Sequence, residues 1–207
     1  MAAHAHAAGG HEALEHEHHG PPPAHQSSRV NPAVLGMLLF IISEVMIFGA
    51  FFTAYFFIRV VNHDPWPAHG TELPKVIAAF NTCILVSSSF TIHFAQESLK
   101  RDNRLGLKVG MVATFLLGLT FLFIQVNEYV HIGFSPADHA QGSIFYGLTG
   151  LHGAHVTIGL MLLAFVTIRA FRGHYSSGGY LGMEVPGIYW HFVDVMWIIV
   201  FFTVYIL

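Results

Sequence analysis

Five stretches of the sequence are long and apolar enough to cross a lipid bilayer, and this feature restricts the fold more than any other. They span residues 33–58, 76–96, 109–127, 142–168 and 187–207. A helix needs about 20 apolar residues to cross a hydrocarbon core roughly 30 Å thick. Only helices and closed barrels satisfy their backbone hydrogen bonds in lipid. Because the stretches lack the alternation of barrel strands, we expect an all-α membrane protein, a bundle of five transmembrane helices.

The low content of charged residues agrees with a protein that lies mostly in lipid. Only 10% of the residues are Asp, Glu, Lys or Arg, whereas soluble domains carry roughly 25%. The nine Lys and Arg residues make no basic face of the kind that nucleic acid binding requires. The single cysteine, Cys83, excludes a disulfide framework within the chain.

Prolines mark the expected starts of three helices, because proline suits the first helical turn, where its missing N–H has no intrahelical partner. Pro32 opens the first apolar stretch, Pro74 the second and Pro186 the fifth. We therefore expect the fifth helix to begin at Pro186.

The distribution of basic residues predicts the orientation, because short cytoplasmic loops carry an excess of Lys and Arg. With five spans, seven basic residues fall on the side of the N-terminus and two on the opposite side. The seven are Arg29, Lys100, Arg101, Arg104, Lys108, Arg169 and Arg172, and the two are Arg59 and Lys75. We expect a cytoplasmic N-terminus and a C-terminus on the outer face.

Residues 1–30 differ in composition from the rest of the chain. They contain seven histidines and the run Pro21 to Pro23, with almost nothing that can join a core. Such a composition predicts a disordered, His-rich cytoplasmic tail and a stiff proline linker ahead of a transmembrane domain over residues 31–207. A histidine-rich tract can also bind metal, which leaves a metal sensor as an alternative role for the tail.

Glu44 is the sharpest polar position inside the apolar stretches. It lies 12 residues after Pro32, about 18 Å along a helix and therefore near the middle of the membrane. A charge there costs roughly 2.5–3.5 kcal/mol on insertion scales, so the residue needs a reason to be present. Two interpretations stay open: a proton-related or cleft-lining carboxylate, and a neutral acid that ties two helices together.

Two histidines in the fourth stretch, His152 and His155, lie one turn apart on one side of a helix. A metal site would need further ligands from elsewhere, for which His191 and, less well placed, His93 are the candidates. The alternative, which we favour, is hydrogen bonding between packed helices and no metal site. Small residues, including Gly150 and Gly153, surround the pair and allow close helix contact.

Two further polar pairs are expected at helix interfaces. Asp194 follows His191 by one turn, which predicts a hydrogen-bonded or ion-paired unit. Glu128 lies near the outer end of the third stretch, beside His131. We assign Glu128, His152, His155, His191 and Asp194 to polar packing within the membrane, and expect no catalytic residue.

The last stretch contains the run Tyr-Trp-His-Phe-Val-Asp-Val-Met-Trp at residues 189–197. This run strongly resembles the closing helix of subunit III of the haem–copper cytochrome c oxidases. The resemblance continues in order from about residue 31 to residue 207. It rests on Ile42 to Val45, Asn81-Thr82, Ser87 to Ser89, Glu128-Tyr129 and Gly150 to His155. Ile42 to Val45 is similar to the helix that carries the family's carbodiimide-reactive carboxylate. The chain is similar to the short, five-helix bacterial form, which lacks the first two helices of the mitochondrial form.

The resemblance implies an accessory, non-redox subunit of a terminal oxidase in the bacterial plasma (inner) membrane. Such a subunit binds the side of subunit I, its main contact, with subunit II and a small subunit IV as further candidate partners. It stabilises the catalytic subunit, holds phospholipids and supports proton uptake. It binds no cofactor itself, because haem and copper belong to partner subunits, and it has no active site of its own.

The resemblance also implies lipid-binding residues, which carry over where the sequences match. Arg169, Arg172 and His174 match the family's basic stretch before the last helix, whereas a further family histidine is replaced by Gly179. Two other functions remain alternatives: subunit III of a quinol oxidase, and a small membrane transporter that uses Glu44 and the histidines. The transporter would be favoured by inverted repeats, which the five unequal stretches do not show.

Overall fold

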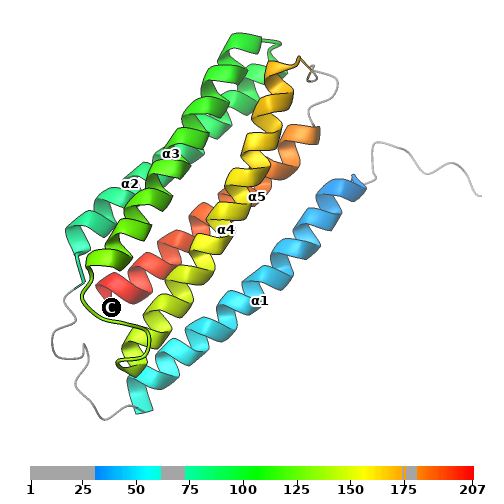
Figure 1. Cartoon of the computed structure of the whole chain (residues 1–207). Helices are drawn as coiled ribbons and strands as arrows, with labels where there is room; N and C mark the ends of the chain where they lie inside the picture. The colour runs from blue at the N-terminus through cyan, green and yellow to red at the C-terminus, as the bar shows by residue number, and fades with distance from the viewer. Residues whose placement is uncertain (1–30, 62–72, 174, 176–180) are drawn as a thin grey trace, which may run out of the picture. The chain divides into compact units, whose positions relative to one another are not determined.

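The structure is a computed structural model that describes residues 31–61, 73–173, 175 and 181–207. The histidine-rich tail predicted over residues 1–30 lies outside the described residues, and so does His174. Five long helices make up the described chain (Figure 1). They are α1 (Pro32–Val61), α2 (Lys75–Lys100), α3 (Arg104–His131), α4 (Ala140–Phe171) and α5 (Leu181–Phe201), and α5 continues into a π-helical turn over Phe202–Ile206.

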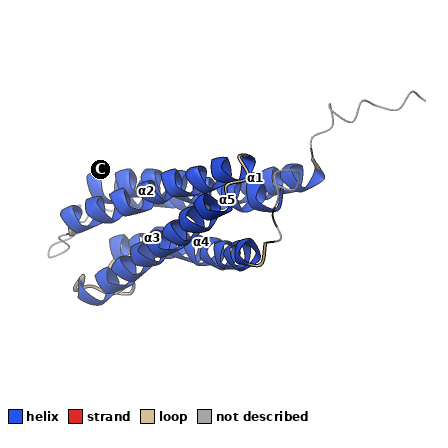
Figure 2. Cartoon of the chain, turned by 90° about the horizontal axis from the view of Figure 1, so that it is seen from above, coloured by secondary structure: helices blue, strands red, loops and turns tan. Residues whose placement is uncertain are grey.

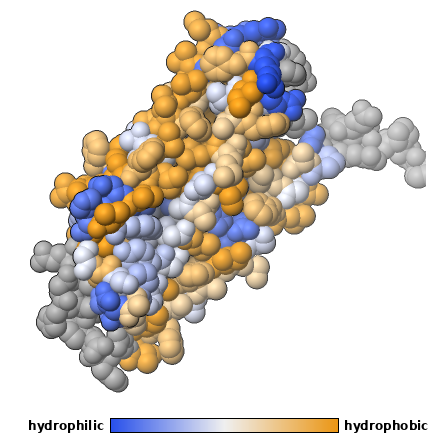
Figure 3. All heavy atoms as spheres, viewed as in Figure 1, coloured by the Kyte–Doolittle hydropathy of each residue, from blue (hydrophilic) through white to orange (hydrophobic). Residues whose placement is uncertain are grey.

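All five helices are long and apolar enough to cross a membrane, which confirms the prediction of an all-α, five-helix membrane protein. Each helix also extends beyond its apolar stretch by a few residues at one or both ends. The ends carry polar and basic residues, which remain helical because their side chains reach the polar zone outside the hydrocarbon core. In the view of Figure 3, hydrophobic residues cover most of the surface between the ends of the bundle, and hydrophilic residues gather at its upper end.

The prediction that α5 begins at Pro186 is wrong. The helix begins at Leu181, and Pro186 lies inside it. At this position the proline leaves the carbonyl oxygen of Gly182 without an intrahelical donor, since proline has no N–H. The helix continues through this position in spite of the missing hydrogen bond, so Pro186 does not mark the helix boundary.

The hairpin of α2 and α3 is held by close backbone contact. The turn between the helices contains Asp102 in a left-handed conformation, with φ of 53°, and the side chain of Asn103 caps α3 by accepting a hydrogen bond from the backbone N–H of Gly106. A methyl group added at Gly110 would lie 2.8 Å from the Cβ of Ala95. Glycine at residue 110 therefore lets the two helices approach closely.

Helix α5 lies among three of the other helices. This helix packs against α1, α2 and α4, whereas α1 packs mainly against α4 and α5 (Figure 2). The large side chains Trp190, Trp197 and Tyr189 of α5 are almost fully buried. The outer surface of α1 remains apolar and exposed, as in Leu39 and Met46, which suits a surface that faces lipid or another membrane subunit.

The ends of the first and last helices lie together. The side chain of Arg59, in the last turn of α1, donates a hydrogen bond of 2.7 Å to the carbonyl oxygen of Leu207. This contact satisfies a carbonyl group at the end of the last helical segment, where intrahelical donors run out. Within residues 32–207, the start of α1 and the C-terminus are thus at opposite ends of the bundle.

Candidate functional site

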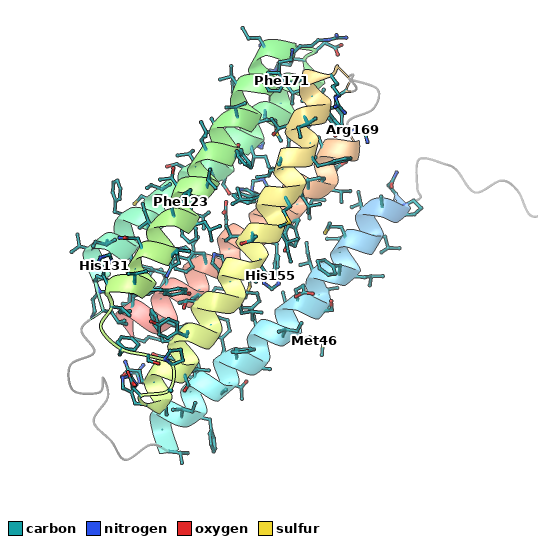
Figure 4. The ribbon with its side chains drawn as sticks, viewed as in Figure 1. Met46, Phe123, His131, His155, Arg169 and Phe171 are labelled. Atoms are coloured by element: carbon teal, nitrogen blue, oxygen red, sulfur yellow. The ribbon has the colours of Figure 1, made fainter. Side chains whose placement is uncertain are left out.

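A carboxyl–imidazole pair joins α1 to α4 inside the apolar part of the bundle. The carboxyl oxygen Oε2 of Glu44 lies 2.8 Å from Nε2 of His155. The two side chains are only 14% and 8% exposed. Figure 4 shows His155 on the side of α4 that faces α1. The structure therefore brings together two residues that the sequence singled out separately.

The hydrogen bond of the second ring nitrogen of His155 determines how many protons the pair holds and what its net charge is. Nδ1 lies 2.8 Å from the carbonyl oxygen of Leu151. A carbonyl oxygen only accepts, so Nδ1 must carry a proton. If the imidazole is neutral, Nε2 is an acceptor and Glu44 donates as a carboxylic acid. If Nε2 is also protonated, Glu44 is a carboxylate and the two charges cancel. In both forms the pair has no net charge and shares one proton.

Aromatic rings of α1 and α5 lie against the imidazole of this pair. The ring of Phe48 lies 5.0 Å from the ring of His155, and the ring of Phe192 lies 6.2 Å away. The hydroxyl of Tyr189 donates to the backbone carbonyl of His155 at 3.3 Å. A neutral pair fits such apolar surroundings, because an uncompensated charge would be strongly disfavoured there.

The predicted unit of His191 and Asp194 is joined through a third residue that the sequence analysis did not assign to it. The hydroxyl of Ser89, on α2, donates to a carboxylate oxygen of Asp194. The same hydroxyl lies 3.1 Å from Nδ1 of His191. The unit therefore links α5 to α2 and not two positions of α5 to each other.

Both tryptophans of α5 also form hydrogen bonds to α2. The indole N–H of Trp190 donates to the hydroxyl of Ser88 at 2.8 Å, and that of Trp197 donates to the hydroxyl of Thr82 at 2.9 Å. In the sequence, the polar residues that recur every turn or two along the otherwise apolar α2 were the only indication that this helix forms hydrogen bonds to a neighbour. It does not by itself say which residue on which helix is bound.

His152 is packed very differently from His155. It is completely buried, and neither ring nitrogen has a hydrogen-bonding partner among the described residues. Its ring lies 4.8 Å from the ring of Trp197 and 5.8 Å from that of Phe121. The described residues contain no group of three or more His, Cys, Asp and Glu side chains arranged to hold a metal ion. The structure thus does not bring His152 and His155 together with a third ligand.

Glu128 finds its partner on the last helical segment and not beside it on α3. The hydroxyl of Tyr205 donates to Oε1 of Glu128 at 2.7 Å. His131, which was expected beside Glu128, instead has Nδ1 at 2.9 Å from the backbone carbonyl of Asn127. The Glu128 contact links α3 to the π-helical turn, a link that requires the geometry of a turn the sequence did not predict.

The predicted lipid-binding arginines lie at the end of α4. Both Arg169 and Arg172 are exposed, and the guanidinium of Arg169 lies 5.7 Å from the ring centres of Phe165 and Tyr175. Burial raises the pKa of the Tyr175 hydroxyl, and the positive charge of Arg169 offsets part of that rise. On α3, the ammonium of Lys108 lies 5.3 Å from the ring of Phe171. Aromatic side chains thus hold two cations at this end of the bundle.

Comparison with known proteins gives a consistent result. The family described as "Cytochrome c oxidase subunit III" matches residues 17–207, which include all five helices. A cytochrome c oxidase subunit 3 of Thermostichus vulcanus is 43% identical over 175 residues, covering 84% of this chain and 87% of that protein. That of a Synechocystis species is 40% identical over 194 residues, covering 93% and 79%. That of Rattus norvegicus is 39% identical over 176 residues, covering 82% and 67%.

Proposed function

Because this chain belongs to the cytochrome c oxidase subunit III family, we propose that it acts as an accessory, non-redox subunit within the complex of a cytochrome c oxidase. It is a multi-pass membrane protein with five spanning helices. The similar proteins carry the name of a cytochrome c oxidase subunit, and this does not favour the quinol oxidase or the transporter. Electron transfer and oxygen reduction take place in partner subunits that hold haem and copper.

The observation that carries the proposed role of this chain is the Glu44–His155 pair. It fixes α1, which otherwise packs mainly through apolar side chains, to α4 in the interior of the membrane. The pair also keeps one proton between two groups without net charge. We propose that it stabilises the arrangement of α1 and supports proton uptake by the complex, while the obligatory proton path runs elsewhere.

A lipid site at the end of α4 is the second part of the proposal. Arg169 and Arg172 are exposed at the end of a spanning helix, where cations attract anionic head groups. The guanidinium of Arg169 also lies over the aromatic ring of Tyr175, and this contact restrains it at the end of α4. We propose that the two arginines bind the phosphate of a phospholipid, together with His174.

The assembly follows from the family and from the charge distribution. We propose subunit I as the main contact, with subunit II and a small subunit IV as further neighbours, in a bacterial inner membrane. The seven basic residues on the side of the N-terminus and the two on the opposite side support a cytoplasmic N-terminus.

Purification through an affinity tag on this chain, from membranes solubilised in a mild detergent, tests the proposal. We expect stoichiometric recovery of the oxidase subunits together with haem and copper, and oxidation of reduced cytochrome c by the purified complex. Recovery of this chain alone, or with an oxidase that accepts electrons only from quinol, would contradict the proposal. Expression of the chain without its partners provides the control and should give no haem absorbance.

A further inference from the structure

A second polar region lies between α2, α3 and the C-terminal segment, and the proposed function makes no use of it. Gln125 is 1% exposed and Glu128 is 5% exposed. Both amide atoms of Gln125, Oε2 of Glu128 and Oδ1 of Asn81 are buried without a hydrogen-bonding partner among the described residues. Buried polar atoms are rarely left unpaired, because each costs about 1–3 kcal/mol in that state.

The residues with unpaired atoms lie within a few turns of one another where α2 faces α3. The amide nitrogen of Asn81 donates to the carbonyl oxygen of Phe121 at 3.2 Å, and Gln125 lies one turn further along α3. Gln125 lies next to the hydroxyls of Tyr129 and Tyr205, although neither of its amide atoms forms a hydrogen bond of normal geometry. A side chain of α3 and one of the C-terminal segment thus lie next to Gln125, and Asn81 of α2 contacts α3 one turn away.

The C-terminal segment adopts an unusual geometry at this place. Phe202–Ile206 forms a π-helical turn, and the backbone N–H of Leu207 donates to the carbonyl of Phe202 at 3.0 Å. The turn brings the hydroxyl of Tyr205 to Glu128. Such wide turns are uncommon and are often found at functional sites.

A surface pocket borders this region at Glu128. It has a volume of about 270 Å³ and is lined by Glu128 and His131, together with Pro74, Ile77, Ile124, Asn127 and Ile132. His131 marks the end of α3 in Figure 4, at the end of the bundle where α2 begins. The pocket greatly exceeds the roughly 10–15 Å³ that one water molecule needs.

We propose that Asn81, Gln125 and Glu128 form a binding site for ordered water, and that the pocket beside Glu128 is its entrance. The unpaired atoms select water over a metal ion. Oε1 of Gln125 and Oδ1 of Asn81 are acceptors, Nε2 of Gln125 is a donor, and Oε2 of Glu128 accepts when the carboxyl group is ionised and donates when it is protonated. A metal ion satisfies acceptors only, but a water molecule both donates and accepts. Water in this site connects the carboxyl group of Glu128 with the aqueous phase at the end of the bundle where Leu207 lies.

Hydroxyl-radical footprinting of the intact oxidase complex in heavy-oxygen water tests this site. X-ray pulses generate radicals from bound water, and these radicals modify the nearest side chains. We expect modification of Tyr205, although only 1% of it is exposed, and of Tyr129, which is partly buried. Trp190 is the internal control, since it is intrinsically more reactive, completely buried and already paired with Ser88. Labelling of Tyr205 no stronger than that of Trp190 would overturn the proposal.

A variant of Gln125 tests whether the modification of Tyr205 depends on water bound at this site. Gln125→Met keeps the unbranched shape and removes both amide groups, so most of the Tyr205 label should be lost. Thr114→Val is the matched control on α3, because Thr114 is equally buried but its hydroxyl is paired with that of Thr91. It should leave the label unchanged. If Gln125→Met does not assemble, Asn81→Leu replaces it. Unchanged Tyr205 labelling in the assembled variant would contradict a water site at Gln125.

Discussion

Replacement of Glu44 separates the structural and the proton-related roles of its pair with His155. In Glu44→Gln, the amide can donate to Nε2 of a neutral His155, so the bond between α1 and α4 is kept. In Glu44→Ala, Nε2 of His155 is left without a partner in a site that is only 8% exposed. Hydrogen bonds between membrane helices average about 0.6 kcal/mol and reach about 1.7 kcal/mol. Leaving a buried polar group unpaired costs about 1–3 kcal/mol.

These magnitudes predict a clear difference between the two variants. Glu44→Ala should weaken the docking of α1 by about 1–3 kcal/mol, which corresponds to roughly a five- to 150-fold change in the equilibrium. Glu44→Gln should change it by less than about 1 kcal/mol.

The assay is retention of this chain by the purified oxidase during a detergent titration, read from subunit stoichiometry on a gel. Ser43→Ala is the matched control, because the hydroxyl of Ser43 is exposed and, among the described residues, donates to the carbonyl of Phe40 in its own helix. A double-mutant cycle with His155→Leu isolates the pair. In that background, Glu44→Ala should have a much smaller effect.

Two results would refute the reasoning. If Glu44→Gln releases the chain as readily as Glu44→Ala, then the hydrogen bond to His155 does not hold α1 in place. If the Gln variant assembles fully but consumes no oxygen at any pH, Glu44 lies on an obligatory proton path, and the chain does more than support the catalytic subunit.

Three further predictions concern packing, orientation and the tail. A methyl group at Gly118 would lie 2.6 Å from the ring of Trp190, whereas Gly150 has open space. Gly118→Val should therefore lower the thermal stability of the complex by about 1–3 kcal/mol, with Gly150→Val as the nearly silent control, and equal melting in both variants would contradict the packing. A phosphatase fused after Leu207 should be active, because we expect the C-terminus on the outer face. Fluorescence of a fluorescent protein fused at the same place would show a cytoplasmic C-terminus and contradict the predicted topology. Deletion of residues 1–28 should leave membrane insertion and assembly intact, and loss of the complex would mean that the tail docks on a partner.

The spanning helices could be predicted from the sequence because hydropathy and helix length are local properties. The same applies to Glu44, since an acid among Phe40 to Phe48 stands out in any membrane helix. The partners of the polar residues could not be predicted in this way. Whether His155 meets Glu44, or Ser89 meets Asp194, depends on how the helices rotate and cross. The π-helical turn that brings Tyr205 to Glu128 has no recognisable sequence pattern, and Pro186 misled the prediction of the start of α5.

The central claim is that this chain supports a cytochrome c oxidase whose redox chemistry takes place in other subunits. The most direct measurement is oxygen consumption by the purified oxidase with and without this chain, followed from the first turnovers through prolonged activity at equal haem content. The account predicts substantial initial activity without the chain, a faster loss of activity during sustained turnover, and recovery of durability when the chain is restored by co-expression. A complete loss of initial activity with haem and copper still present would contradict it, and so would identical durability of the two preparations.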